Sequence, residues 1–265
     1  MSKLVTKFNT LGLAALLLVG AGAVLVMSTP ESEEVPGEVR APITPQSKPS
    51  LDVSSLENEP PILKNLGVSI DVWNKQTNLA GDLIFDKRII YDDGYSANNK
   101  VFLDFGSKDK YRINDVGAIE YWFYVPLGTK VRSPVDGTVQ VVFFEHTKDW
   151  GVTLVPKGSR WLVSFEHLVN LSVKEGDVVR AGDILGEAAP RINTVIAMVE
   201  LVVWTGGESI VKYCPFNFLD ESLKPLYKEK INQLAFDWEE FTGQNVYKQE
   251  AWVLPGCLVD RVIER

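Results

Sequence analysis

Only two side chains in this chain offer imidazole chemistry, His146 and His167. A catalytic zinc ion takes about three nitrogen or oxygen ligands and keeps an open position for water, so two histidines alone do not complete such a site. Glu120, Glu166 and Glu200 fall on segments with strand-like alternation, which would place some of them on one side of a sheet with His167. Their spacing follows no metal-ligand motif, and His146 falls in a polar stretch typical of an exposed loop.

The elements that position these residues are marked by two similar turn patterns. Gly128-Thr129 and Gly176-Asp177 each precede a Val, and a second small turn at Gly137 or Gly182 follows before a new apolar run. Glycine adopts the backbone conformations of tight turns without steric strain. Each of the two patterns therefore predicts a strand, a turn and a second strand. The repetition predicts a small antiparallel barrel or sandwich.

The order of these turns resembles the duplicated hybrid motif shared by lysostaphin-type (LytM-type) zinc endopeptidases and by biotinyl and lipoyl carrier domains. The resemblance covers roughly residues 112–205 and is carried by Val125-Pro126-Leu127-Gly128-Thr129, then Phe165-Glu166-His167-Leu168, then the Gly-Asp and Ala-Gly turns of residues 173–186. It implies a mainly β fold, an antiparallel barrel or sandwich. Residues 63–111 add a predicted N-terminal β extension, with alternating runs at 68–72, 83–85 and 101–105.

The resemblance also implies where zinc ligands belong, and this chain lacks them. The His-x-x-x-Asp pair of the endopeptidases falls on Ala118 and Trp122, and their His-x-His strand falls on Ile196 and Met198. None of these four side chains ligates zinc. The domain is therefore similar to a degenerate endopeptidase, with no metal ligand and no cofactor expected.

His167 alone matches a functional position of that family, the histidine that assists a zinc-bound water. Without the metal, the resemblance leaves either a structural histidine or a polar role in ligand binding. The residues around the vacated metal positions form the predicted binding face: Trp122, His167, Met198, Tyr121 and Tyr124. Flat aromatic rings suit sugar rings or an extended peptide, or alternatively fill the space of the missing zinc site.

The carrier-domain branch of the resemblance is excluded. Val199 stands where a biotinyl domain carries its modified lysine. Lys157 is the one candidate for a lipoyl hairpin, and its Pro156-Lys157-Gly158 context is typical of a solvated turn.

The N-terminal segment predicts export. Lys3 and Lys7 precede an apolar run over residues 11–27, which indicates an uncleaved signal anchor at 1–27, with a cleaved signal peptide as the alternative. Residues 28–62 are rich in Pro, Ser and Glu and predict a disordered tether. The sequence thus predicts a single-pass, membrane-anchored protein whose folded part, residues 63–265, is extracytoplasmic.

The C-terminal extension, residues 206–265, contains a helical pattern over residues 219–240. Asp220 or Ser222 is the expected N-cap, and Gly243 the expected stop. Cys214 and Cys257 are the only cysteines and bracket this helix. In an exported protein, a disulfide between them is the economical interpretation.

Two functions follow from these expectations. The first is an extracytoplasmic endopeptidase-like domain without a catalytic zinc site, which binds a cell-envelope polymer or an envelope protein. The alternative is an active zinc metallopeptidase that hydrolyses cell-wall material through non-standard ligands, and only this alternative requires zinc. The net charge of −8 and the lack of a clustered basic face exclude nucleic acid as a partner.

Overall fold

The computed structural model describes residues 59–91, 99–107, 118–192 and 195–264. The chain divides into two units, Met1–Ser50 and Leu51–Arg265, and all described residues belong to the second. The predicted anchor and most of the predicted tether therefore lie outside the described residues, and their boundaries stay predictions.

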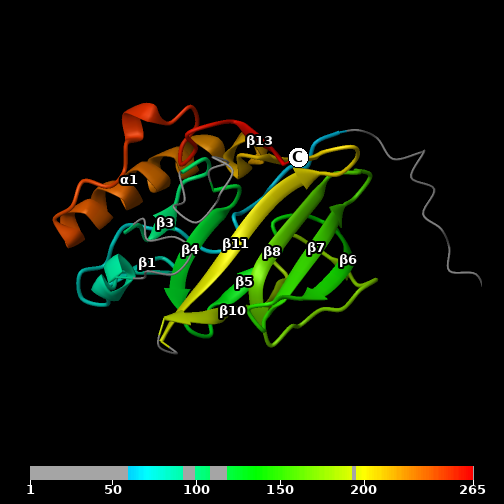
Figure 1. The fold of residues 1–265 in the computed structure, drawn as a ribbon, viewed down its shortest axis with the longest axis horizontal. Helices are drawn as coiled ribbons and strands as arrows, with labels where there is room; N and C mark the ends of the chain where they lie inside the picture. Colours follow the sequence, from blue (N-terminus) through cyan, green and yellow to red (C-terminus); the bar gives the residue numbers. More distant parts are fainter. Residues whose placement is uncertain (1–58, 92–98, 108–117, 193–194, 265) are drawn as a thin grey trace, which may run out of the picture. The chain divides into compact units, whose positions relative to one another are not determined.

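The described part is mainly β, as predicted, with a large antiparallel sheet and one long helix (Figure 1). The strands are β1 (Leu79–Ala80), β2 (Leu83–Ile84), β3 (Phe102–Leu103), β4 (Tyr121–Pro126), β5 (Lys130–Arg132), β6 (Gly137–Phe144), β7 (Trp150–Pro156), β8 (Leu162–Val169), β9 (Val178–Val179), β10 (Ile184–Ile192), β11 (Ile196–Thr205), β12 (Ile210–Tyr213) and β13 (Arg261–Glu264). The helices are η2 (Lys87–Tyr91), η3 (Pro215–Phe218), α1 (Lys224–Thr242) and η4 (Gln249–Ala251).

Strand β11 organises the sheet because it pairs on both sides along its whole length. On one side its first half pairs with β10 and its second half with β8. On the other side its first half pairs with β4 and its end with β12. The strand is almost continuously apolar from Ile196 to Val203, which is the pattern of a strand buried on both faces. Its sequence thus suits the central position that it takes in Figure 1.

The turns that suggested the repeat lie where the sequence placed them. Gly128, Gly176 and Gly182 have φ values of 84°, 87° and 97°. These left-handed conformations favour glycine, since other residues are strained there. β4 and β5 flank the first turn, and β9 and β10 flank the turn at Gly182.

The N-terminal extension differs from its prediction in one segment. Leu83–Ile84 and Phe102–Leu103 form strands, and β3 pairs with β4. Residues 68–72 form no strand, although Val68 and Ile70 are buried as the alternation predicted. Ser69 bonds to Asp82 there: its N–H donates to the Asp82 side chain, and its carbonyl accepts the backbone N–H of Asp82, so no strand ladder forms.

Helix α1 packs against this extension. The indole ring of Trp238 lies 5.3 Å from the ring of Phe85, and its Nε1 donates to the carbonyl of Asn99 at 2.7 Å. The predicted stop at Gly243 is confirmed by its left-handed C-cap. The predicted N-cap is wrong: the helix begins at Lys224, and Asp220 instead accepts two hydrogen bonds from Ser222 in the preceding turn.

Cys214 and Cys257 form the predicted disulfide, with their Cα atoms 6.1 Å apart. Both residues are fully buried. The bond ties the start of η3 to the segment before β13.

The predicted membrane-anchored localisation requires a correction. Within the described ranges, no helix combines the length and the apolar composition needed to cross a bilayer. The apolar run at residues 11–27 lies outside these ranges. A single-pass anchor is therefore not supported, and it has no part in the function proposed below.

Candidate carboxylate and histidine site

A row of neighbouring residues crosses three strands at the centre of the sheet. Glu200 on β11 pairs with Trp122 on β4 on one side and with Glu166 on β8 on the other. Directly opposed residues of antiparallel strands share a face, so these three side chains lie together. Met198 lies two residues along β11 and faces the same way. The positions of the missing zinc site thus share a face with two of the carboxylates that the sequence singled out.

His167 joins this row because β8 is irregular there. The backbone of His167 has a φ of 63°, and Val152 and Trp150 pair with Phe165 and Leu168, so that two residues, Glu166 and His167, oppose one. This is the arrangement of a β-bulge, which turns a side chain away from strict alternation.

Both ring nitrogens of His167 contact carboxylates. Nδ1 lies 3.0 Å from Oδ2 of Asp149, and Nε2 lies 3.2 Å from Oε1 of Glu200. The backbone N–H of His167 donates to Oε1 of Glu145 at 3.2 Å. Since carboxylates only accept, each ring nitrogen donates a proton, and the ring is an imidazolium cation.

The charge of His167 follows from these contacts. Burial opposes the charged form, but the hydrogen bonds to Asp149 and Glu200 outweigh it and raise the pKa of His167 to about 11. Burial likewise opposes ionisation of Asp149, but hydrogen bonds from His167 and Thr147 hold its pKa below the ordinary value. Thr147 donates its hydroxyl to Oδ1 of Asp149 at 2.6 Å, so the turn between β6 and β7 fixes the carboxylate.

Glu166 keeps its proton, whereas Asp149 is ionised. Burial, followed by the charges of Glu200, Glu120 and Glu145, raises the pKa of Glu166 to about 8, with a partial offset from Lys212. The carboxyl group is therefore mostly protonated at pH 7. A neutral acid directly opposite Glu200 reduces the repulsion between the two groups.

Glu120 closes the site at the β4 end. Its Oε2 accepts the indole N–H of Trp122 at 3.2 Å and the backbone N–H of Ile119 at 3.1 Å. Nζ of Lys212 lies 3.7 Å from its Oε1 and 3.4 Å from Glu264. The indole of Trp122 is thus held by a hydrogen bond as well as by packing.

The residues at the family's zinc positions do not fit a zinc ion. Ala118, Trp122 and Met198 are all buried and offer no nitrogen or oxygen ligand. One other set of side chains, among the described residues, has metal-ligand spacing: atoms of Glu145, Asp149 and His167 lie within 4.8 Å of one another. The imidazolium of His167 has no lone pair for a metal while both its nitrogens carry protons.

Comparison with known proteins identifies the central part of the chain. The profile of Peptidase family M23 matches residues 121–210. Residues 121–210 therefore form an M23-like domain, called the M23 domain below. Among solved structures, the catalytic domain of lysostaphin from Staphylococcus simulans is 19% identical, with 39% of this chain and 78% of that chain covered at a TM-score of 0.34.

Two further structures are similar to the M23 domain. LytU is 21% identical, over 41% of this chain and 75% of its own, with a TM-score of 0.35. A zinc-containing peptidase from Vibrio cholerae is 23% identical, over 39% of this chain and 34% of its own, with a TM-score of 0.32. A comparison with curated protein sequences finds no match.

The structure brings together most of the predicted binding face of the M23 domain. Trp122, Met198 and Tyr124 share one face, where all three are buried, and His167 lies beside them. Tyr121 lies on the other face of β4, and its hydroxyl donates to the carbonyl of Pro255 at 2.7 Å, beside the disulfide. Tyr121 therefore does not line this site.

Sequence reasoning missed the two acids that fix His167. Glu145 and Asp149 flank the turn between β6 and β7, and the backbone N–H of Glu145 donates to the carbonyl of Asp149 at 2.8 Å. Paired acids at the two ends of a short turn were visible in the sequence. Their contact with β8 depends on the pairing of β7 with β8, which no local pattern fixes.

Glu166→Gln is expected to make the domain less sensitive to alkaline pH. The pKa of Glu166 is raised in the folded state, so the folded state holds its proton while the unfolded state releases it, and stability falls as pH rises from about 4.5 to about 8. Glutamine removes this loss. At pH 9 the variant should melt roughly 10–20 °C above wild type, for a gain of about 5 kcal/mol, and near wild type at pH 4.5.

Thermal melts from pH 4.5 to 9 test this expectation. Glu250→Gln removes one exposed carboxylate elsewhere and serves as the matched control. Parallel stability profiles for wild type and Glu166→Gln would show that Glu166 ionises normally in the folded protein.

Proposed function

We propose that the M23 domain binds a polymer or a protein of the cell envelope and does not hydrolyse it through zinc. Family M23 domains are usually extracellular cell-wall hydrolases, and relatives act on peptidoglycan. One observation supports the absence of zinc catalysis. The buried side chains of Trp122 and Met198 stand at two positions where the family has zinc ligands.

The protonation of His167 supports the same proposal. A histidine that assists the attack of water must accept a proton at one ring nitrogen. Here Asp149 and Glu200 accept from both nitrogens, so the imidazolium has no free position for a proton. The cluster around His167 instead holds β8, β11 and the turn between β6 and β7 together. The function that we propose for the domain is therefore recognition through its surface.

A cosedimentation experiment tests the proposal. The purified protein should pellet with insoluble peptidoglycan, contain less than about 0.1 zinc per chain, and release no soluble fragments. Absence of binding to wall material and to envelope proteins would overturn it.

The hydrolase alternative keeps one supporting observation, the ligand spacing of Glu145, Asp149 and His167. Under this alternative the protein would hold one zinc ion per chain and cleave wall peptides. Asp149→Asn would then abolish both properties. Zinc retention and cleavage by wild type, with loss of both in this variant, would replace our proposal.

Restoring the family's ligands should create a zinc site. Ala118→His, Trp122→Asp and Met198→His together supply three ligands, because Trp122 and Met198 already share a face. Zinc binds only the folded state of this variant, so the melting temperature should rise by about 5 °C or more with excess zinc. Wild type and the variant without Met198→His should shift by less than about 1 °C. Equal shifts in wild type and the triple variant would indicate a native zinc site.

A further inference from the structure

A hollow lies at the far end of β11, away from the carboxylate and histidine site. Its volume is about 320 Å³, at the lower end of the range for ligand pockets and large enough for a sugar ring. It is lined by Arg160, Trp161, Thr205, Gly206 and Tyr213. Several of these residues precede β8 or join β11 to β12, so strand ends shape the hollow.

The hollow opens on the other side of the sheet from the candidate site. Tyr213 pairs with Val203 on β11, and Val203 and Thr205 are odd-numbered positions of that strand. Glu200 is an even-numbered position, so its side chain points to the opposite face. A ligand in this hollow would therefore not contact His167.

Aromatic rings form the floor of the hollow. The rings of Trp161 and Tyr213 lie 4.8 Å apart, and the ring of Phe218 lies 5.1 Å and 5.8 Å from them. Phe218 is buried, whereas Trp161 and Tyr213 are half-buried and keep accessible surface. A packed cluster of this kind presents its rings with little loss of side-chain entropy on binding.

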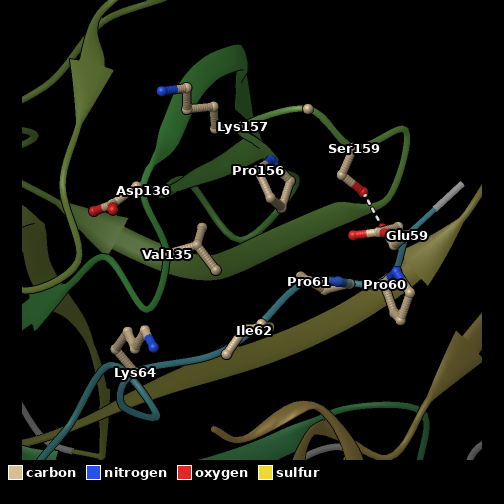
Figure 2. Close-up of a pocket in the computed structure, with 11 residues that line it drawn as sticks. Glu59, Pro60, Pro61, Ile62, Lys64, Val135, Asp136, Pro156, Lys157 and Ser159 are labelled. Atoms are coloured by element: carbon tan, nitrogen blue, oxygen red, sulfur yellow. Dashed lines mark hydrogen bonds between the residues drawn. The ribbon is translucent and has the colours of Figure 1, made fainter. Parts of the chain in front are cut away.

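The N-terminal segment Glu59-Pro60-Pro61, called the strap below, fixes the backbone of the hollow. The N–H of Trp161 donates to Oγ of Ser159 at 3.1 Å, and this hydroxyl donates to the carbonyl of Glu59 at 2.7 Å. Figure 2 shows Ser159 reaching Glu59, with Pro60 and Pro61 next to it. The segment before β8 is thus tied to the strap, and Trp161 is positioned before any ligand arrives.

The polar groups of the hollow favour an anionic ligand. Arg160 is exposed and offers a planar guanidinium, which binds carboxylates through paired hydrogen bonds. Thr205 adds a hydroxyl beside the exposed backbone of Gly206. Flat rings, one cation and one hydroxyl match a sugar ring that carries a carboxylate.

We propose that this hollow binds a carboxylate-bearing sugar of an envelope glycan, with the ring over Trp161 and Tyr213 and the carboxylate on Arg160. The inference rests on the proposed function and names one site for it. A sugar fits better than an extended peptide, because β8, β11 and β12 are each paired on both sides. No free edge of these strands is left to pair with a peptide backbone.

Titration calorimetry with two soluble glycans tests the site on the full chain. The acidic probe is a peptide-free oligosaccharide of N-acetylglucosamine and N-acetylmuramic acid, and chitotetraose is the neutral comparison. Wild type should bind the acidic probe more tightly. Arg160→Gln should weaken the acidic probe about tenfold and leave chitotetraose unchanged, since only the charged contact is lost. Arg180→Gln, an exposed arginine elsewhere, should change neither affinity.

Trp161→Leu should weaken both probes, because the ring contact is common to them. If this variant fails to fold, Arg160→Gln and Thr205→Val carry the test, since both positions are at the rim. No binding of either probe by wild type, or equal acidic-probe binding by wild type and Arg160→Gln, would overturn the proposal.

Cosedimentation with peptidoglycan separates failure of the site from failure of the proposed function. If wild type pellets with the wall but binds neither soluble glycan, the function stands and this site is wrong. If wild type does not bind wall material or envelope proteins, the proposed function itself fails. Tighter binding of a polyglutamate peptide than of the acidic glycan would show that the hollow binds a peptide, and the proposal of a sugar ligand would be wrong.

Discussion

Cys257→Ser is expected to lower the melting temperature of the domain by roughly 6–16 °C. The disulfide joins residues that are 43 positions apart, and closing a loop of this size stabilises the folded state by about 3–4 kcal/mol. A domain of this size loses about 2–4 °C for each kcal/mol. Differential scanning calorimetry of the purified protein measures the shift.

The matched control removes both thiols. Cys214→Ser with Cys257→Ser should melt within a few degrees of the single variant, because the first replacement already opens the loop. Wild type treated with a reducing agent should approach the same temperature. Two alkylatable thiols in the native wild-type protein would show that the bond is absent.

The fold could be predicted because its turns carry local signals. Gly128, Gly176 and Gly182 adopt left-handed conformations that few other residues tolerate, so each turn is visible in the sequence without knowledge of its partners. The apolar run of β11 likewise marks a strand buried on both faces. The helix end at Gly243 rests on the same kind of local rule.

The site could be predicted only in part, because it depends on pairing between distant strands. Alternation predicted that some of Glu120, Glu166 and Glu200 could share a side of the sheet with His167. The register of β8 with β11 places Glu166 opposite Glu200. Strict alternation would have sent His167 to the other face. The bulge at His167 turns it towards Glu200, and a bulge leaves no reliable mark in a single sequence.

Most of the predicted binding face is buried in the structure. Trp122, Tyr124 and Met198 are each at most 3% exposed. The sequence indicates aromatic residues at the vacated zinc positions, but it does not show whether they line a cleft or fill it. Trp161 and Tyr213 are half-buried and line a hollow elsewhere on the domain, and neither residue matched the family pattern.

His167→Ala is expected to destabilise the domain by about 3–5 kcal/mol at pH 6. The side chains of Asp149 and Glu200 are only 9% and 6% exposed, and removal of the imidazolium leaves two buried negative charges without their shared cation. Chemical denaturation at constant ionic strength measures the loss. His146→Ala, on the exposed turn beside Glu145, is the matched control and should change stability by less than about 0.5 kcal/mol.

The pH dependence of this difference separates charge from packing. The pKa of His167 is raised to about 11, so its contribution is complete below about pH 6.5 and is lost as the pH rises towards 11. The lowered pKa of Asp149 makes its contribution complete above about pH 4 and lost as the pH falls further. The difference between wild type and His167→Ala should therefore be largest between about pH 4 and 6.5 and smaller on both sides. A difference that stays constant from pH 3 to 10 would mean that the ring stabilises the bulge by packing, and the ionic account of this site would be wrong.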